Sequence, residues 1–300
     1  MLRFKPFYQP ALWGGHRLSE VFGRALPEGL IGESWELVEL PERHSEVADG
    51  PLAGQKLGDL WRRGALGGQA AGPFPFLLKW IDARQSLSVQ VHPDEAACER
   101  LGQGRPKAEA WYVAEADPEP GGTLLIGHYP GLDAASLRQA VVGGTLKKWL
   151  YETRPRPGDI FLLDAGTIHA IGAGLLLLEV QQPSDTTFRI YDFGRVGADG
   201  RPRALHLDEA AVSIHYDRLM VPRPLRQGAQ GPCFSMRPAA LGDAVAAGPL
   251  RVFAATTKGA RLTTDSGVEA LAPGQVVVCQ ADDGPVALAE GEAVFVSDPS

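Results

Sequence analysis

The sequence has few cysteines and no long apolar run. Its three cysteines, Cys98, Cys233 and Cys279, lie far apart and form no Cys-x-x-Cys pair, which argues against a disulfide framework or a cysteine metal site. No apolar stretch approaches the roughly 20 residues of a membrane-spanning helix. The first residues, Met-Leu-Arg-Phe-Lys-Pro, lack the apolar core of a signal peptide. We therefore expect a cytoplasmic protein that does not cross a membrane.

An excess of positive charge is also missing. The formal net charge is −7, whereas binding to a nucleic-acid backbone requires a broad basic surface. We therefore expect no nucleic-acid partner. A small anionic ligand stays compatible with this composition, provided that basic residues cluster locally.

Turn-forming residues, in contrast, are abundant. The 300 residues include 36 glycines and 24 prolines, and 44% are hydrophobic, which favours a mainly β protein with a real core and only short helices. Helical composition is confined to excursions near 57–62, 94–101, 133–151 and 207–216. Because glycines and prolines crowd 222–232, we predict a large domain over 1–225 and a small β-domain over 226–300. All seven histidines precede residue 233, so the small domain offers no imidazole to a metal.

A row of polar side chains follows one face of a predicted strand over residues 86–92. Alternate side chains of a strand point to opposite faces, so Ser86, Ser88, Gln90 and His92 share one face and apolar residues share the other. An ordinary half-buried strand would turn the polar face to water. This strand instead ends in His-Pro, and we expect its polar face to line the inside of a β-barrel.

Two further motifs offer metal ligands to the same interior. Lys107-Ala-Glu109 repeats the two-residue spacing on a second predicted strand, and Gly-Thr-Ile-His169 begins a third. Two imidazoles, a carboxylate and an amide oxygen form a ligand set that suits a divalent metal such as zinc and leaves a position open. We expect one metal per chain, bound by Gln90, His92, Glu109 and His169, with Gln90 either a direct ligand or a hydrogen-bond partner of a water. Of the remaining histidines, His128, His206 and His215 are expected in solvated or capping positions, and His16 and His44 are expected to be structural.

These motifs resemble those of a known family. The stretch 158–169 resembles the second cupin motif with Asp164 in place of proline, and Gln90-Val-His92 resembles the first with glutamine in place of histidine. Within the cupins the chain is similar to the short bacterial form of type I phosphomannose isomerase. The blocks that carry this resemblance are Leu12–Gly15, Gly32–Trp35, Leu87–Asp94, Lys107–Tyr112, Gly166–Ala170 and Gln181–Asp192. The resemblance implies a mainly β, jelly-roll cupin barrel with short helical excursions and a small C-terminal β-domain.

The resemblance also implies the function and the residue roles. The family isomerises mannose 6-phosphate and fructose 6-phosphate with a zinc held by the residues matching Gln90, His92, Glu109 and His169, and its catalytic arginine matches Arg189. Because an arginine keeps its proton near neutral pH, we assign Arg189 to electrostatic stabilisation of the enediolate or to substrate orientation. The proton-transfer group stays open among Asp185, Lys107 and a hydroxide on the metal. Candidate phosphate contacts are Lys79, Lys107, Ser86 and Ser88.

Three other functions are compatible with the same predicted barrel fold. One is an isomerase of another sugar phosphate such as glucose 6-phosphate, and a second is a non-haem iron oxygenase that uses two histidines and a carboxylate. A third is a non-catalytic sugar-phosphate sensor, which would not need Asp185 and Arg189. The sequence leaves open whether the chain is a monomer or a homodimer.

Overall fold

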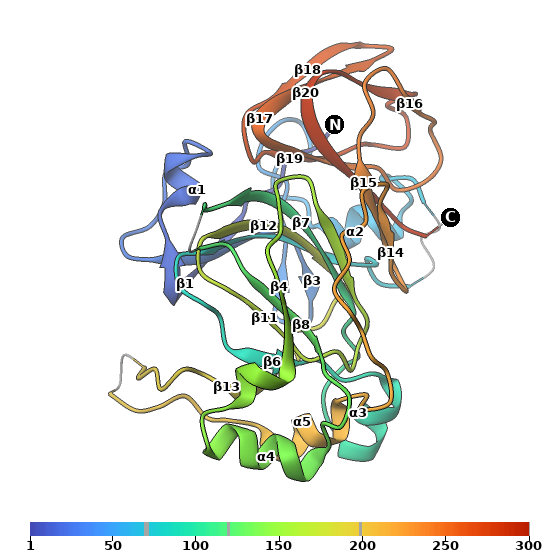
Figure 1. Cartoon of the computed structure of the whole chain (residues 1–300). Helices are drawn as coiled ribbons and strands as arrows, with labels where there is room; N and C mark the ends of the chain where they lie inside the picture. Colours follow the sequence, from blue (N-terminus) through green and yellow to red (C-terminus); the bar gives the residue numbers. More distant parts are fainter. Residues whose placement is uncertain (69–71, 119–120, 198–199, 300) are drawn as a thin grey trace.

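Four layers make up the chain in the computed structural model, which describes residues 1–68, 72–118, 121–197 and 200–299. A C-terminal sheet covers one face of a six-stranded sheet, a five-stranded sheet covers the other, and short helices cover the outer face of the five-stranded sheet (Figure 1). The expectation of a mainly β protein is therefore confirmed.

The six-stranded sheet forms the centre of the molecule. Its order is β1 (Phe7–Gly15), β2 (Ile31–Leu37), β5 (Leu77–Ala83), β12 (Leu175–Gln181), β7 (Glu109–Ala116) and β10 (Ile160–Leu163). All neighbouring strands pair antiparallel. Every residue of β5 and β12 is buried, because both faces of this sheet are covered. The apolar sequence of these two strands thus reflects a position between two other layers.

The five-stranded sheet faces the six-stranded one. Its order is β13 (Phe188–Tyr191), β6 (Val89–Val91), β11 (His169–Ile171), β8 (Leu124–His128) and β9 (Leu150–Thr153). Trp111 and Phe161 of the first sheet pack with Ile126 and Ile171 of the second in one buried cluster. Across the described residues the ladder hydrogen bonds keep the two sheets separate, as in a jelly roll of two facing sheets.

Apart from α1 (Arg17–Glu20), which was not expected, the short helices lie where helical composition was expected. They are α2 (Leu57–Arg62), α3 (Glu95–Leu101), α4 (Ala134–Val142), the 3₁₀ helix η1 (Leu146–Trp149) and α5 (Leu207–Ser213). Asp94 begins α3, because its Oδ1 accepts a hydrogen bond from the Ala97 N–H at 2.7 Å. Apolar residues of α4 and α5, Leu137 and Ala210, pack against the five-stranded sheet. The helices α3, α4 and α5, with η1, therefore cover the outer face of the sheet that carries His169, whereas α1 and α2 contribute to the core on the other side of the six-stranded sheet.

The C-terminal residues form a third sheet. It comprises β14 (Ala229–Gln230), β15 (Ser235–Pro238), β20 (Val286–Ser297), β17 (Val252–Thr264) and β18 (Gly267–Leu271), with β16 (Ala244–Val245) on β20 and β19 (Val276–Val278) on β17. Leu2 near the N-terminus pairs with Val278 of this sheet. A separate hairpin joins β3 (Glu39–Leu40) and β4 (Arg43–His44). The division into domains at residue 225 stays a prediction.

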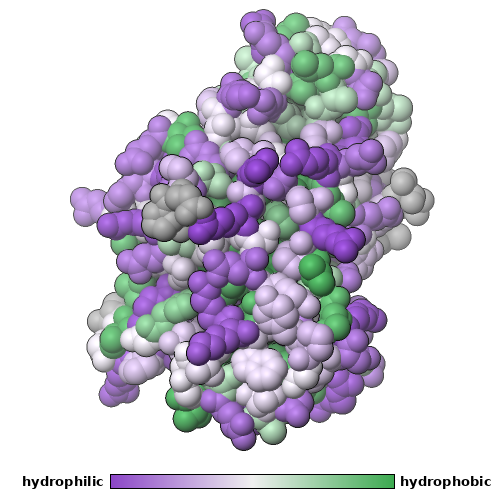
Figure 2. All heavy atoms as spheres, viewed as in Figure 1, coloured by the Kyte–Doolittle hydropathy of each residue, from purple (hydrophilic) through white to green (hydrophobic). Residues whose placement is uncertain are grey.

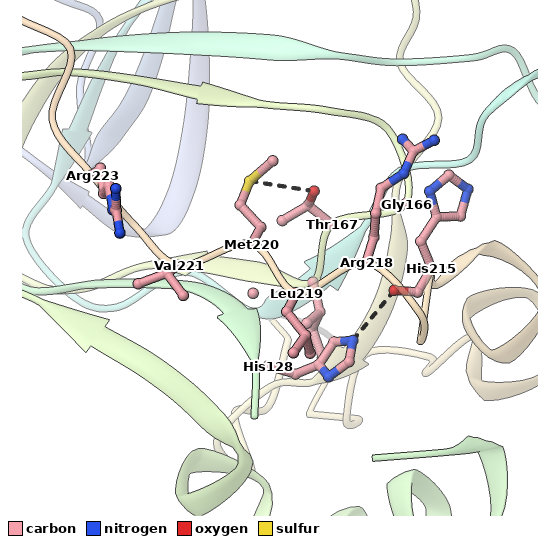
Figure 3. Close-up of a pocket in the computed structure, with 11 residues that line it drawn as sticks. His128, Gly166, Thr167, His215, Arg218, Leu219, Met220, Val221 and Arg223 are labelled. Atoms are coloured by element: carbon pink, nitrogen blue, oxygen red, sulfur yellow. Dashed lines mark hydrogen bonds between the residues drawn. The ribbon is translucent and has the colours of Figure 1, made fainter. Parts of the chain in front are cut away.

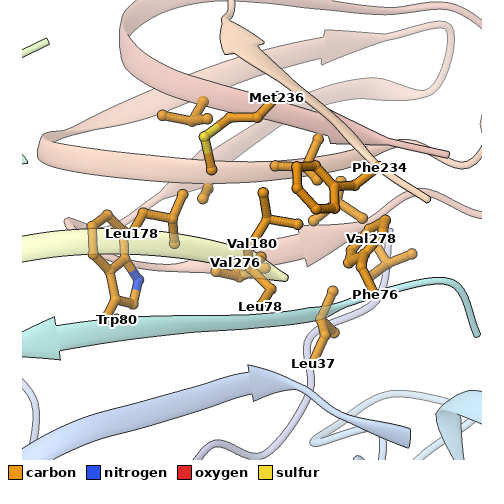
Figure 4. Close-up of a cluster of buried hydrophobic side chains, with 14 of the residues drawn as sticks. Leu37, Phe76, Leu78, Trp80, Leu178, Val180, Phe234, Met236, Val276 and Val278 are labelled. Carbon is orange, nitrogen blue, oxygen red and sulfur yellow. The ribbon is translucent and has the colours of Figure 1, made fainter. Parts of the chain in front are cut away.

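The C-terminal sheet and the six-stranded sheet share one hydrophobic core. Leu78, Trp80 and Leu178 project from the six-stranded sheet toward Met236 and Val276 of the C-terminal one (Figure 4). Burying such side chains is the main favourable contribution to folding, at about 25 cal/mol per Å² of apolar surface. The packing therefore couples the stability of the C-terminal sheet to that of the sheet that carries Glu109.

We expect Leu178→Ala to lower the free energy of unfolding by about 2–5 kcal/mol, because it leaves a cavity between two packed sheets. Leu178 is 0% exposed. Urea denaturation followed by circular dichroism measures the change. Leu241→Ala is the control, since Leu241 is 66% exposed and should change stability by less than about 0.5 kcal/mol. A loss at Leu178 as small as that of the control would contradict the shared core.

Polar and charged residues cover much of the visible surface, with hydrophobic residues scattered among them (Figure 2). None of the helices in the described ranges is long and apolar enough to cross a membrane.

Candidate metal centre and active-site cavity

A carboxylate and two imidazoles meet between the two facing sheets. Glu109 begins β7 of the six-stranded sheet, while His92 follows β6 and His169 begins β11 of the five-stranded sheet. The His92 Nε2 lies 3.2 Å from one Glu109 oxygen, and the His169 Nε2 lies 3.4 Å from the other. All three residues are buried. The structure thus brings together three of the four predicted ligands, with their donor atoms within 4.8 Å of one another.

A contact at the Nδ1 atom, on the side of the ring away from Glu109, fixes the orientation of each imidazole. The Nδ1 of His92 lies 2.9 Å from the Thr186 carbonyl oxygen, and the Nδ1 of His169 lies 2.8 Å from the Thr167 carbonyl oxygen. A carbonyl can only accept, so each Nδ1 carries the proton and each Nε2 presents a lone pair to Glu109. Outer contacts of this kind hold metal-ligating histidines in one tautomer.

The protonation states suit a metal. Burial, with a further contribution from the positive charge of Lys107, lowers the pKa of His92 to about 3. Burial also lowers the pKa of His169. For Glu109, burial alone would raise the pKa, but the positive charge of Lys107 outweighs it and holds the pKa well below its ordinary value. At neutral pH the cluster therefore consists of two neutral imidazoles and a carboxylate.

The buried polar atoms of this cluster are poorly satisfied. The His92 Nε2 and both Glu109 carboxylate oxygens make no hydrogen bond within the described part of the chain, although the Lys107 ammonium lies 3.1 Å from one of the two oxygens. Unpaired buried acceptors are costly, and here lone pairs face one another. A cation bound between these atoms would pair the unsatisfied acceptors and would also remove the repulsion between their lone pairs. The residues present therefore fit a divalent metal. The structure therefore supports a metal cofactor.

Gln90 lies beside this cluster. Its Nε2 is 3.3 Å from the His169 Nε2, and its Oε1 accepts a hydrogen bond from the Ser88 hydroxyl at 3.3 Å. A half-turn of the amide exchanges these two atoms and directs the oxygen toward His169 without moving the chain. Direct ligation by Gln90 stays a prediction.

A row of alternating charges extends from Glu109 across the inner face of the six-stranded sheet. Lys107 Nζ lies 3.1 Å from Glu109 and 3.8 Å from Glu179, and Lys79 Nζ lies 3.0 Å from Glu179 and 3.5 Å from Glu33. Such buried charges persist because each has a partner. The row fixes the position of Lys107, which the sequence placed on the same face as Glu109.

Glu179 is a site residue that the sequence prediction missed. Its other oxygen accepts a hydrogen bond from the Trp111 indole at 2.8 Å, and burial together with the charge of Glu109 raises its pKa. The available signal was a single acidic residue within the apolar strand Leu175–Gln181, since a carboxylate is rarely buried without a function or a partner.

A cavity of about 650 Å³ opens onto this row. Arg189, Asp185, Lys107, Lys79, Ser88 and Gln90 line it, together with Trp35, Arg43 and Arg203. Ser86 is not among its lining residues, whereas its neighbours Leu87 and Ser88 are; all three precede β6, which begins at Val89. The predicted substrate contacts at Lys79 and Ser88 thus border the cavity, while the one at Ser86 does not.

Arg189 and Asp185 border the cavity in different ways. Arg189 pairs with Gln90 across β13 and β6, and its side chain donates a hydrogen bond to the Ala204 carbonyl at 3.0 Å. Burial and the nearby Arg203 lower the pKa of Arg189, but a guanidinium keeps its charge near neutral pH. Asp185 is exposed at the rim. A fixed cation therefore lies beside the metal centre, and a carboxylate lies at the entrance.

A second hollow lies away from this centre. The chain from His215 to Arg223 crosses a cavity of about 380 Å³ beside Gly166, Thr167 and His128 (Figure 3). The expectation that His128 is solvated is wrong, because it is buried and its Nε2 lies 3.3 Å from the His215 carbonyl. His92, Glu109 and His169 do not line this hollow.

Comparison with known proteins agrees with these observations. Residues 1–123 match the family described as phosphomannose isomerase type I, catalytic domain. A Bacillus subtilis protein described as a probable mannose-6-phosphate isomerase, GmuF, is 35% identical over 227 residues, which cover 74% of this chain and 71% of that relative. The mannose-6-phosphate isomerase of Streptococcus mutans is 41% identical over 202 residues, covering 66% and 63%.

A solved structure confirms the predicted fold class. The crystal structure of the mannose 6-phosphate isomerase from Bacillus subtilis superposes with a TM-score of 0.86 at 26% identity and covers 99% of this chain and 98% of that one. An alignment with 35% identity over 227 residues, such as that with GmuF, does not arise by chance between unrelated proteins. The chain therefore belongs to the type I phosphomannose isomerase family.

Proposed function

We propose that this chain is an aldose–ketose isomerase that interconverts mannose 6-phosphate and fructose 6-phosphate. The observation that carries the proposal is the buried cluster of His92, Glu109 and His169 directly behind a cavity, because its contact residues Lys107 and Gln90 line that cavity together with Arg189. Family membership agrees with it, since the relatives are described as mannose-6-phosphate isomerases. A non-haem oxygenase would not need the two cations, and the relatives do not favour a non-catalytic sensor.

Zinc is the metal that we expect. Two imidazole nitrogens and a carboxylate oxygen form a typical ligand set of catalytic zinc, with Gln90 or a water completing the site. When bound, the metal supplies a Lewis acid that stabilises negative charge developing on the sugar oxygens without changing its own redox state.

The side chains around the metal have separate roles in the proposed reaction. Isomerisation removes the proton from C2 and returns a proton to C1, while negative charge develops on the oxygens of an enediol. Arg189 stabilises that charge, because it lies next to Gln90 and keeps its own proton. The Lys107 ammonium, held by Glu109 and Glu179, donates a hydrogen bond to a sugar oxygen. Asp185 is the candidate base, since its carboxylate lines the same cavity.

One coupled assay tests this proposal. Turnover of mannose 6-phosphate should exceed that of glucose 6-phosphate by at least about 100-fold, because the transition-state contacts fit one stereochemistry. Equal or greater activity on glucose 6-phosphate would reassign the substrate. Absence of turnover by the metal-loaded protein would favour a sensor.

Removal of the metal should abolish activity reversibly. After treatment with a chelator and buffer exchange, we expect less than about one percent of the original activity and a lower melting temperature, because a metal that binds only the folded state stabilises it. Addition of one equivalent of zinc should restore both. A metal-free preparation that is fully active would contradict the metal site.

A further inference from the structure

Five cations line the active-site cavity, and they differ in how they are paired. They are Arg43, Lys79, Lys107, Arg189 and Arg203. Lys79 and Lys107 each contact carboxylates of the buried row. Arg203 donates two hydrogen bonds to Asp192, at 2.7 and 2.6 Å. Arg43 and Arg189 are the two that contact no carboxylate in the described parts of the chain.

Arg43 is held by aromatic rings instead. It lies on β4 of the small hairpin, and its guanidinium carbon is 4.6 Å from the centre of the Trp35 ring and 5.7 Å from that of Phe7. No acceptor among the described residues takes a hydrogen bond from its guanidinium. Stacking holds the plane of a guanidinium while leaving the N–H groups at its edge available. The arrangement therefore presents an oriented cation to the cavity.

The stacked ring connects Arg43 to the metal end of the cavity. Trp35 pairs with Lys79 across β2 and β5, and its ring centre lies 5.9 Å from the Lys79 Nζ. The row then continues through Glu179 to Lys107 and Glu109. Neighbouring strands are about 4.8 Å apart, so the three steps from β7 to β2 separate the backbones of Glu109 and Trp35 by roughly 14 Å. Long side chains and an extended sugar phosphate together bridge that distance.

We propose that Arg43 binds the phosphate group of the substrate and thereby selects phosphorylated sugars. This inference rests on the proposed isomerase function. Arg189 is adjacent to the metal centre through Gln90, so the cavity presents one cation without a carboxylate at the reacting end and another at the far end. A sugar phosphate has matching ends, with developing oxyanions at C1 and C2 and a dianion at C6. The guanidinium fork suits phosphate oxygens through paired hydrogen bonds.

A contact at the non-reacting end has a defined kinetic signature. It is the same in the ground state and the transition state, so its removal raises KM and leaves kcat nearly unchanged. It also matters only for substrates that carry the phosphate. A purely structural role for Arg43 would instead alter kcat, or would affect phosphorylated and free sugars alike.

The test compares Arg43→Met with the wild-type protein, both loaded with zinc. Methionine keeps an apolar stem over Trp35 and removes the N–H groups. We expect KM for mannose 6-phosphate to rise at least about tenfold, with kcat within about threefold. The inhibition constant of inorganic phosphate as a competitive inhibitor should rise by a similar factor, and kcat/KM for free mannose should stay unchanged. Arg43→Lys, which keeps the charge but loses the fork, should fall in between.

Arg105→Ala is the matched control. Arg105 borders the adjoining hollow of about 550 Å³ that Arg43 also lines, but not the catalytic cavity. It should keep the wild-type KM for mannose 6-phosphate. An equal rise in both variants would overturn a direct contact by Arg43, as would an unchanged inhibition constant for phosphate in Arg43→Met. If the wild-type protein itself does not isomerise mannose 6-phosphate, the proposed function fails before this inference is reached.

Discussion

Glu109→Gln is expected to abolish metal binding and, with it, isomerase activity. Glu109 is 1% exposed and its oxygens face both imidazoles and the Lys107 ammonium. Glutamine has nearly the same volume, so the packing of β7 is kept while the negative charge that the metal requires is lost. We expect metal content to fall from about one ion per chain to less than a tenth of that, and kcat/KM to fall at least ~1000-fold. Plasma mass spectrometry and the coupled assay measure the two changes.

Glu115→Gln is the control for this substitution. Glu115 lies on the same strand, but it is partly exposed and is not a member of the cluster. This variant should keep its metal and its activity. If Glu109→Gln retained a full complement of metal, the carboxylate would not be a ligand, and the metal site would have to be sought elsewhere.

Arg189→Ala should have the second largest effect, and it should separate catalysis from metal binding. Arg189 borders the cavity next to Gln90, and its Nε is buried without a partner within the described ranges. Removing one preorganised donor to a developing oxyanion typically lowers kcat by about 100- to 1000-fold. We expect that loss in a folded protein that still contains one metal per chain. Steady-state kinetics, metal analysis and circular dichroism on one preparation measure the three quantities.

Two companion variants sharpen this result. Arg189→Lys keeps a positive charge and should recover part of kcat, although lysine cannot reproduce the guanidinium geometry. Arg84→Ala removes an exposed arginine just beyond β5 and should leave kinetics unchanged. Near-wild-type turnover in Arg189→Ala would remove the assigned role. Loss of metal from that variant would instead make Arg189 a support for the metal centre.

Much of the fold and of the metal centre could be predicted from local patterns. The Gln90-Val-His92 and Lys107-Ala-Glu109 spacings identified which side chains share a face, because strand geometry fixes that relation within a few residues. Helical composition near 94–101 and within 133–151 likewise indicated α3 and α4. These signals depend on neighbours in sequence, so the sequence is sufficient to read them.

Other features depended on which strands pair. Glu179 became a site residue because β12 lies between β5 and β7, which brings it beside Lys79 and Lys107. Ser86 does not line the cavity and Leu87 does, because regular strand geometry holds only from Val89 and the alternation expected for the preceding residues is lost. His128 became buried because the chain after α5 crosses over it. Pairing between strands far apart in sequence leaves no local pattern by which it could be predicted.

The sequence by itself determined the residue types and the spacing of the candidate ligands, and a mainly β chain that places them on inward faces. Only the tertiary structure decided that Glu109 from one sheet meets His92 and His169 from another, and that Arg43 lies over Trp35 at the cavity. The physical reason is that backbone geometry sets which face a side chain occupies, whereas the choice of facing sheet follows from burying all apolar faces at once.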